Sequence, residues 1–462
     1  MKVSFISLNT FEPIDTPLGI ASIVAYCKRY IQVEFRLFDA NFHNVLEETT
    51  RFNPEIIGIT SMTNDYKKVI DFAKEIKLSL NARIILGGVH ISTLPESFQD
   101  CFDIAVIGEG EETFLEILQN KPLKDIKGIL YWENGKIKKT EQRPLLNINS
   151  LPIPDRSIFH KNYFKPRPLP TNKLGIRGTI ISSRGCPFKC SFCSTSNFWK
   201  KPRYSSPERT VMEIEDLIKN YNVEYIYIWD DLFTLNKEKL KETINLIKKK
   251  GLKFQAQVQL RADSIDEELL ELLKELNVVE VSFGLESGSQ KILNHLKSNT
   301  TTVEQNKNAI LLCKKHGFKT SAAIIFGSPY EKIEDLKETI KLIEFLYKNG
   351  VHDISPFVLT PFPGTKMWEL AKERKKVSNN LNWDLLDLYS SNNAYNPLLL
   401  DEDVDKKEFR KLIKKIGRLQ KKFKTRILLE EIKSNPLDIA KRIIKKPKTA
   451  IKFLIKRSIY RL

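Results

Sequence analysis

The chain has 462 residues, of which 41% are hydrophobic and 29% charged, as in a soluble globular protein of two or three domains. No apolar run approaches the ~18 residues that span a bilayer. The first ten residues lack the pattern of a secretion signal. Six cysteines in this length exclude a disulfide-built scaffold and fit a reducing compartment, so we expect a cytoplasmic protein.

The net charge of +18 is concentrated at the C-terminus. Residues 406–462 hold 21 Lys and Arg against four acidic residues, a net charge of +17 that leaves +1 for the first 405 residues. Because the body of the protein is nearly neutral, the main argument for a nucleic-acid partner is removed.

The first 125 residues alternate apolar runs with amphipathic stretches. The apolar runs indicate buried strands at 1–8, 34–40, 55–62, 82–90 and 103–111. Helical patterns lie between them, for example at 17–30 and 65–80. This alternation predicts an α/β fold, a Rossmann-like doubly wound parallel sheet, in which ligands bind beyond the carboxyl ends of the strands.

Three further segments follow. Residues 126–172 predict a linker that contains a hairpin around Asn134 and a Pro-rich irregular connection. Residues 173–370 resume the alternation, with apolar runs at 178–184, 223–231, 253–261, 278–287, 319–327 and 352–360. Six β/α repeats predict a partial (β/α)6 barrel of the TIM type, with its chemistry at the carboxyl ends of the strands. Residues 371–462 predict a helical extension, with the basic tail from 406.

Three cysteines directly after the first barrel run form the most specific pattern in the chain. Cys186, Cys190 and Cys193 are spaced Cys-x3-Cys-x2-Cys, so three thiolates on one loop can wrap a soft metal centre. A zinc site usually has a fourth Cys or His nearby, and the other three cysteines are scattered. A [4Fe–4S] cluster normally takes four Cys, so three would leave one iron open for a non-protein ligand.

This spacing, with the aromatic Phe192 before the last Cys, resembles the radical S-adenosylmethionine (SAM) superfamily over about residues 179–365. The resemblance implies a [4Fe–4S] cluster that cleaves SAM to a 5′-deoxyadenosyl radical, fed by a reductant such as flavodoxin or ferredoxin. It also implies SAM contacts at Phe192, Asp230, Asp231, Arg261, Glu286, Gly327 and Glu331.

Each implied SAM contact has a role in this resemblance. Asp230 or Asp231 would bind the SAM amino group, Arg261 the carboxylate and Glu286 the ribose. Gly327 and Glu331 would form the turn near the adenine. The Asp pair replaces the common Gly-Gly-Glu, which leaves open which of the two carboxylates takes the role.

Residues 1–125 resemble the cobalamin-binding domain that precedes some radical SAM barrels, through the segments PLGIA, GITSMTNDY, LGGVHIS and IGEGEETF. The implied cobalamin contacts are Thr10, Thr60, Ser61, Gly87, Gly88, His90, Gly108 and Glu109. The Asp-x-His-x-x-Gly motif that supplies an axial His to cobalt is absent, so we expect cobalamin without a protein imidazole on cobalt. Two points stay open. His90 either ligates a metal or packs and hydrogen-bonds in a turn, and the domain either binds cobalamin or has lost its ligand and serves as a lid.

The two implied cofactors together favour a methylase-like enzyme that methylates an unactivated carbon of a small-molecule or lipid-linked substrate. The alternatives are a cobalamin-dependent radical cyclisation or rearrangement, a tRNA-modifying methylthiotransferase-like enzyme, and a non-catalytic cobalamin or Fe–S sensor. The methylthiotransferase would need a second cluster, for which Cys27 and Cys101 are too few. The sequence assigns no catalytic residue.

The basic tail carries apolar residues at helical spacing over 406–426, and a similar pattern over 436–462. A basic amphipathic helix can lie on an anionic membrane, which would place the protein at the inner membrane face and favour a lipid-linked substrate. With equal weight, the helix can pack its apolar stripe on the barrel and leave its basic face in solvent.

Overall fold

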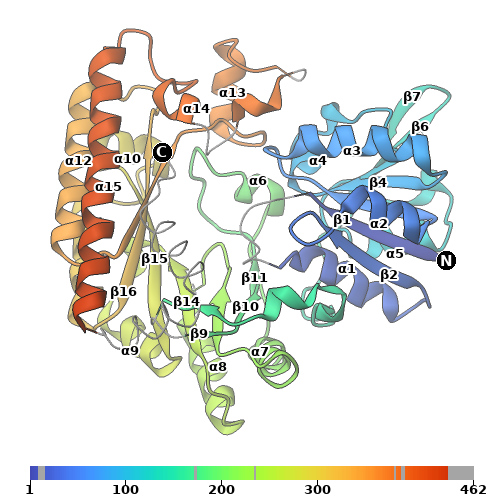
Figure 1. The fold of residues 1–462 in the computed structure, drawn as a ribbon, viewed down its shortest axis with the longest axis horizontal. Coiled ribbons are helices and arrows are strands. Elements are labelled where there is room, and N and C mark those ends of the chain that lie inside the picture. Colours follow the sequence, from blue (N-terminus) through green and yellow to red (C-terminus); the bar gives the residue numbers. More distant parts are fainter. Residues whose placement is uncertain (9–15, 171–173, 234–235, 379–380, 387–390, 435–462) are drawn as a thin grey trace.

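The computed structural model describes residues 1–8, 16–170, 174–233, 236–378, 381–386 and 391–434. Two α/β parts lie side by side, and a long C-terminal helix covers the outside of the second part (Figure 1). No helix within these described ranges is long and apolar enough to cross a membrane.

The N-terminal part is built on a seven-stranded sheet of order β2-β1-β3-β4-β5-β6-β7. The parallel strands are β1 (Lys2–Ser7), β2 (Glu34–Asp39), β3 (Ile56–Thr60), β4 (Arg83–Gly87) and β5 (Ile104–Val106). The helices that follow these strands in turn are α1 (Leu18–Lys28), α2 (Val45–Phe52), α3 (Tyr66–Ser79), α4 (Val89–Thr93) and α5 (Glu111–Leu118), with the short helix η1 (Pro95–Ser97) after α4.

Helices pack on both faces of this sheet, and successive side chains of each strand point to opposite sides, into two separate cores. Phe5 lies in the core formed with α1 and α5, and the next residue, Ile6, lies in the core formed with α2 and α3. This is the doubly wound arrangement that the sequence predicted.

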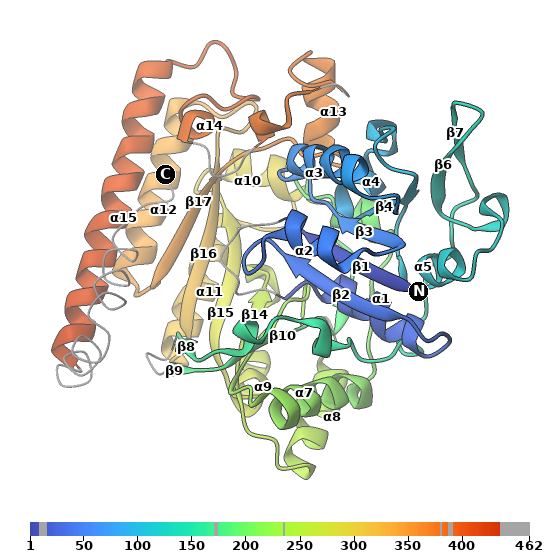
Figure 2. The same ribbon diagram turned by 45° about the vertical axis from the view of Figure 1, so that its right-hand side comes forward.

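The predicted hairpin is present, and it extends this sheet. After the short helix η2 (Leu123–Asp125), strands β6 (Ile129–Glu133) and β7 (Lys136–Lys139) add to β5 in antiparallel fashion. Asn134 and Gly135 have φ of 52° and 72°, as a tight two-residue turn requires. The sheet therefore continues past residue 125, and the hairpin lies at its outer edge (Figure 2).

The predicted linker continues as an ordered connection. It contains the short helices η3 (Arg156–Ile158) and η4 (Lys161–Phe164) and the strand pair β8 (Arg167–Pro168) and β9 (Leu174–Gly175). The fully buried Arg156 donates to Glu213 Oε1 at 2.5 Å and to the Thr179 carbonyl at 2.9 Å. This segment is thereby anchored to the barrel.

The second part is a six-stranded parallel sheet of order β10-β13-β14-β15-β16-β17. Its strands are β10 (Arg177–Ile180), β13 (Tyr225–Ile228), β14 (Gln255–Leu260), β15 (Val278–Glu286), β16 (Lys319–Phe326) and β17 (Asp353–Val358). The helices that follow these strands are α7 (Pro207–Tyr221), α8 (Lys237–Lys249), α9 (Glu267–Glu275), α10 (Gln290–Lys297), α11 (Val303–Lys315) and α12 (Ile333–Lys348), and the turn η5 (Ala262–Ser264) follows β14. Among the described residues β10 and β17 do not pair, so the barrel is partial, as predicted.

A short excursion after β10 carries the cysteines. Strand β11 (Ser183–Arg184) pairs with β12 (Arg203–Tyr204), and α6 (Thr195–Trp199) lies between them in sequence. Gly185 has φ of 97°, and a Cβ at this position would lie 2.9 Å from the Trp199 Cβ, so the start of the cysteine loop requires glycine.

The C-terminal extension is helical. It contains α13 (Lys366–Glu373), η6 (Trp383–Leu386), α14 (Ser391–Tyr395) and α15 (Lys406–Ser434). Helix α15 buries Phe409, Ile413 and Ile416 in the barrel core, and Phe423 stacks on Tyr347 with ring centroids 3.6 Å apart. Of the two alternatives for this helix, the structure has the packed one. The second basic stretch, 436–462, lies outside the described residues.

Candidate active site

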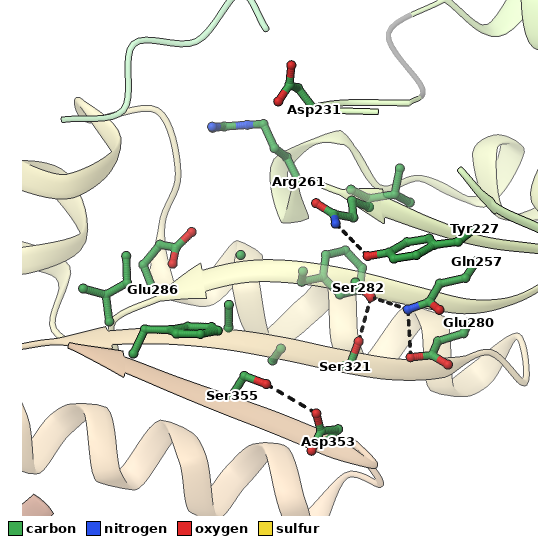
Figure 3. Close-up of a pocket in the computed structure, with 18 of the residues that line it drawn as sticks. Tyr227, Asp231, Gln257, Arg261, Glu280, Ser282, Glu286, Ser321, Asp353 and Ser355 are labelled. Atoms are coloured by element: carbon green, nitrogen blue, oxygen red, sulfur yellow. Dashed lines mark hydrogen bonds between the residues drawn. The ribbon is translucent and has the colours of Figure 1, made fainter. Parts of the chain in front are cut away.

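A cavity of about 1400 Å³ occupies the inner side of the open barrel sheet. It is lined by side chains from the strands, from the cysteine loop and from the segment that precedes β10. Figure 3 shows Asp231, Arg261 and Glu286 at one side of this cavity, with a hydrogen-bonded set of polar side chains at the other. The interior of a closed TIM barrel is filled by packed side chains, so a cavity of this size is a consequence of the open sheet.

All three motif cysteines line this cavity, and all three are free and partly exposed. Among the described residues no three His, Cys, Asp or Glu side chains are close enough to hold a single metal ion. Three thiols that face one roomy cavity from a single loop instead suit a larger metal–sulfur cluster. Phe192 lines the same cavity beside them.

The structure separates the two candidate aspartates. Asp230 is buried and accepts hydrogen bonds from the Ser182 amide at 2.6 Å, the Ser182 hydroxyl at 2.5 Å and the Ser183 amide at 3.0 Å. It holds the loop after β10 and is not among the described residues that line the cavity. Asp231 lines the cavity, where it accepts from the Gly185 amide at 3.2 Å and the Thr195 hydroxyl at 3.1 Å.

Arg261 follows β14 and is held from several sides. Its Nε and Nη2 donate to the two carboxylate oxygens of Asp263 at 2.9 and 2.7 Å, and Nη2 also donates to Thr300 and Thr301 at 2.8 Å. The guanidinium lies 3.6 Å from the ring centroid of Phe188, and Nη1 lies 3.8 Å from Cys190 Sγ. A fixed positive charge therefore stands beside the cysteine loop. Burial raises the pKa of Cys190, and Lys297 and Arg261 act in the opposite direction.

Glu286 is turned into the cavity by an irregularity at the end of β15. The register with β16 shifts between Gly284 and Glu286, and Glu286 has φ of 63°, which is uncommon for a residue with a side chain. Its Oε1 lies 3.4 Å from Nζ of the buried Lys297. Burial raises the pKa of Glu286, although Lys297 and Arg261 act in the opposite direction. Strained backbone of this kind concentrates at functional sites.

Gly327 and Glu331 form a turn, as the motif implies, but neither is among the described residues that line the cavity. Glu331 Oε2 accepts from the Gly327 amide at 2.6 Å and from the Ser328 amide at 3.3 Å. Burial raises the pKa of Glu331 to about 8. A Cβ on Gly327 would lie 2.5 Å from Pro397, so this glycine is needed to let the chain before α15 approach the turn.

A second cavity, of about 370 Å³, lies at the carboxyl ends of the N-terminal strands. Among the predicted cobalamin contacts, those that line it are Thr60, Ser61, Gly87, Gly88, Gly108 and Glu109. Thr10 lies outside the described residues. A Cβ on Gly108 would meet no atom within 4 Å, so at this position the glycine leaves open space beside the backbone.

The lining of the second cavity suits part of a bulky ligand. Gly87, Gly108 and Gly110 bring backbone rather than side chains to its wall, and apolar side chains are also part of its lining. Backbone amides and carbonyls can then hydrogen-bond the amide groups of a corrin. The cavity is smaller than a complete cobalamin, so it would enclose a portion of that cofactor.

Two predicted residues of this domain are used internally. A Cβ on Gly88, which has φ of 103°, would lie 2.5 Å from the Ser61 carbonyl oxygen, so the close approach of two loops requires this glycine. His90 is fully buried between Tyr66 and Trp383 and does not line the cavity. Its Nδ1 lies 3.1 Å from the Thr63 hydroxyl, and burial lowers its pKa to about 3. His90 is therefore a neutral packing residue, the alternative that the sequence left open.

An ion-pair network joins the two domains at the second cavity, and it was not predicted from the sequence. The buried Glu109 pairs with Arg184 and, at 2.9 Å, with Arg203. Glu111 pairs with Arg184 at 2.6 Å and accepts from the Ser22 hydroxyl at 2.9 Å. Glu109 was predicted as a ligand contact, but its carboxylate is occupied by these arginines. Only the charges themselves were visible in the sequence, because their pairing depends on how the domains meet.

The two cavities meet at α6. Cys193, Ser194 and Thr195 line the barrel cavity, while Phe198 and Trp199, less than two helical turns further, line the N-terminal cavity. Arg184 and Arg203 both approach the Trp199 ring, at 5.6 and 5.7 Å from its centroid. One short segment, residues 193–199, thus contributes to the walls of both the cysteine site and the glycine-lined site.

Comparisons with known proteins assign a family model to each of the two domains. The model of the radical SAM superfamily matches residues 180–343, and that of the B12 binding domain matches residues 6–118. An uncharacterized methyltransferase of Pyrococcus horikoshii is 33% identical over 384 residues, which cover 79% of this chain and 80% of that protein. An anaerobic magnesium-protoporphyrin IX monomethyl ester cyclase of Rubrivivax gelatinosus is 30% identical over 384 residues, covering 78% of this chain and 67% of that protein.

A solved structure extends the likeness to the fold. The radical SAM methyltransferase TsrM of Kitasatospora setae, solved with cobalamin and a [4Fe–4S] cluster bound, superposes with a TM-score of 0.68. The match covers 81% of this chain and 78% of TsrM at 18% sequence identity. At that identity the comparison shows a shared fold.

Proposed function

The chain belongs to the radical SAM superfamily, in the group that carries a B12-binding domain, and we propose that it methylates an unactivated carbon of a substrate held in the barrel cavity. A single observation carries the proposal: the cysteine-lined cavity and the glycine-lined cavity share α6 and the residues just before it in their walls. A substrate carbon near this wall would lie within reach of chemistry from both sides.

The residues that would hold each group follow from the lining of the cavities. Cys186, Cys190 and Cys193 would hold a [4Fe–4S] cluster, and the backbone at Gly87 and Gly108 would support cobalamin. When bound, these groups supply reductive cleavage of SAM and a methyl group carried on cobalt.

The protein's own side chains would then bind and orient SAM. Asp231 offers a carboxylate to the SAM ammonium group, and Glu286 offers one to the ribose hydroxyls. Arg261 stands between them with Nη1 directed at the cysteine loop, so it provides the positive charge for the SAM carboxylate. Of the two open candidates for the ammonium group, the cavity lining favours Asp231.

The apolar part of the cavity wall would protect a radical from water. Leu260, Phe283, Ile325, Phe357 and Leu359 line the cavity alongside the predicted SAM residues. Exclusion of water prevents side reactions of a reactive intermediate. The electron would come from an external reductant, for which flavodoxin and ferredoxin are our candidates.

Isotope labelling tests the proposed methyl transfer. The anaerobically reconstituted full chain is incubated with SAM deuterated in its methyl group, a reductant and a set of candidate substrates. We expect a product heavier by a CD3 group in place of hydrogen, together with 5′-deoxyadenosine. Formation of 5′-deoxyadenosine with substrate consumption but no label in any product would contradict methyl transfer.

A radical cyclisation is the second candidate, because the cyclase relative shares 30% identity over 384 residues, which cover 78% of this chain. In the labelling experiment it would give an unlabelled product. A methylthiotransferase is disfavoured by the structure, since Cys27 and Cys101 are buried in cores on opposite faces of the N-terminal sheet. These two thiols cannot hold one second cluster without unfolding the domain.

We also propose that residues 436–462, which hold nine Lys and Arg and one acidic residue, bind an anionic membrane at the inner face. Helix α15 already packs on the barrel core, so the test compares the full chain with a variant that ends at Ser434 and keeps that helix intact. Full-length protein should sediment with phosphatidylglycerol vesicles and the truncated chain should stay in solution. Equal sedimentation of the two would contradict the proposal.

A further inference from the structure

The end of the barrel cavity formed by the first residues of the strands is polar and cationic. In a closed TIM barrel, bulky branched apolar side chains fill the interior. Here the inward-facing positions are polar, namely Tyr227, Gln257, Gln259, Glu280, Ser282, Ser321, Asp353 and Ser355. Figure 3 shows most of these side chains at the side of the cavity away from Asp231 and Arg261. The cations that line the cavity near them are Arg167, Arg177, Lys319 and Lys424.

The two carboxylates at this end already have partners. Glu280 Oε1 lies 3.3 Å from His352 Nε2 and accepts a hydrogen bond from Gln257 at 3.1 Å. Asp353 Oδ1 lies 3.8 Å from Lys424 Nζ, and its other oxygen accepts from the Ser355 hydroxyl at 3.4 Å. Four cations against these two carboxylates leave an excess of positive charge at this end of the cavity.

Among the described residues, no carboxylate pairs with the Arg177 guanidinium. Arg177 is the first residue of β10 and lines the cavity, and its side chain makes no hydrogen bond or ion pair with the part of the chain that the structure describes. Its Nε is buried and its guanidinium stands 5.6 Å from the Tyr225 ring centroid. A buried donor without an acceptor is costly, so this guanidinium is suited to an acceptor that a ligand brings.

Helix α15 also contributes side chains to the lining of the barrel cavity. Lys424 and Ile427 line the cavity, although they lie in the basic extension that follows the barrel. The apolar stripe of α15 fixes the helix on the barrel core and so presents Lys424 to the cavity. Part of the C-terminal positive charge is therefore directed inward.

We infer that this end of the cavity binds an anionic oxygen group of the substrate, a carboxylate or a phosphate, through Arg177 with support from Lys424 and Lys319. A guanidinium can donate two parallel hydrogen bonds to either group. The apolar middle of the cavity would hold the body of such a substrate, with the reacting carbon toward the cysteines. The inference rests on the proposed function, because it names the substrate class of the same site.

Calorimetric titration of the reconstituted full chain tests the inference, without SAM or reductant. The probes are octyl phosphate, octanoate and neutral octanamide, each below its micelle-forming concentration. We expect at least one anion to bind about tenfold or more tightly than octanamide, as a charge-assisted hydrogen bond would give. Comparison of the two anions shows whether the group is a phosphate or a carboxylate.

Three variants locate the anion. Arg177→Gln should remove the tenfold preference, Lys424→Gln should reduce it, and Lys421→Gln, which changes an exposed lysine of the same helix that does not line the cavity, should leave it unchanged. Arg177→Lys keeps the positive charge but loses the two parallel donors of the guanidinium, so it should retain part of the preference for the anion. It replaces Arg177→Gln in the test if that variant misfolds.

Two results would overturn the inference. One is equal binding, or no binding, of the anions and octanamide by the unchanged chain. The other is that Lys421→Gln loses as much of the preference for the anion as Arg177→Gln does. If Arg177→Gln misfolds, the comparison is made with Lys424→Gln. Neither depends on catalysis, so failure here is distinguishable from failure of the labelling test for methyl transfer.

Discussion

The barrel cavity and the N-terminal cavity use their predicted residues in different ways. In the barrel, the cysteines, Asp231 and Glu286 point side chains into the cavity. In the N-terminal domain, Gly88 serves the approach of two loops and Glu109 pairs with Arg184 and Arg203. What faces the second cavity among the predicted residues is largely backbone, at Gly87 and Gly108, and the hydroxyl residues Thr60 and Ser61 also line it.

This difference shows why one site is so much easier to recognise in a sequence. Side chains that ligate a cluster must be of one chemical type at fixed spacing, which leaves a short and specific pattern. A large ligand held by backbone and shape tolerates many side chains, provided that small residues stand where it approaches. The comparison predicts that substitutions in the barrel cavity affect chemistry, whereas several in the N-terminal domain affect folding.

The largest expected effect is the loss of the cluster. Replacing Cys186, Cys190 and Cys193 together by Ala should bring cluster iron and 5′-deoxyadenosine formation below detection, because no other thiol lines the cavity. Cobalamin bound by the N-terminal domain should be retained. Iron analysis, the UV–visible spectrum and chromatography of the products measure the three quantities.

Cys313→Ala is the matched control for this triple variant. Cys313 is buried in the barrel core and does not line the cavity, so the control should keep both cluster and cleavage. Survival of the cluster in the triple variant would contradict the assignment of these three cysteines as its ligands.

The next largest effect concerns the junction of the domains. Glu109→Gln removes the charge of the buried Glu109 from its pairs with the partly buried Arg184 and Arg203, and removal of one partner of a buried pair costs ~3–5 kcal/mol of unfolding free energy. Denaturant unfolding measures the loss. Glu112→Gln, whose carboxylate pairs with Arg143 nearer the surface, should cost about 1 kcal/mol or less. A Glu109→Gln variant that keeps its stability but loses cobalamin would instead make Glu109 a ligand contact.

Most of the fold followed from periodicity, and most of the barrel site followed from one motif. Alternating apolar runs predicted the parallel strands of both sheets, because buried strands between amphipathic helices leave that pattern. The cysteines, Arg261 and Glu286 all fall at the carboxyl ends of strands and all line the barrel cavity. Placement of the hairpin β6–β7 against β5 was missed, since a hairpin pattern does not indicate which sheet edge it joins.

What the sequence could not decide depended on tertiary neighbours. Asp230 and Asp231 are adjacent and chemically identical, and only the loop after β10 makes one structural and the other accessible. The inward role of Lys424 was invisible, because a basic amphipathic pattern is the same whether its helix lies on a membrane or on a barrel. His90 and Glu331 were predicted as contacts because their motifs match, yet both are buried away from the cavities.

A smaller effect is expected in the dependence of stability on pH. Burial raises the pKa of Asp230 to about 6, above the value of 3.8 for the free side chain. The folded state therefore holds this proton more tightly than the unfolded state, so stability should fall as the pH rises from about 4 to 6, by up to ~3 kcal/mol. Asp230→Ala should flatten this part of the profile, measured by chemical unfolding at each pH. An unchanged slope would mean that Asp230 does not titrate there.

The smallest expected effect separates Asp231 from its neighbour most cleanly. Asp231→Asn removes one charge from the cavity wall while keeping an oxygen for the Gly185 amide or the Thr195 hydroxyl, so the melting temperature should stay within ~2 °C. If Asp231 pairs with the SAM ammonium group, SAM affinity should fall about tenfold, the lower range for a charge-assisted hydrogen bond. Equilibrium dialysis with labelled SAM measures the affinity. Asp230→Ala should behave in the opposite way, with lowered stability and near-normal SAM affinity in the fraction that stays folded. Equal losses of SAM affinity in the two variants would mean that the loop after β10, rather than the Asp231 carboxylate, determines binding.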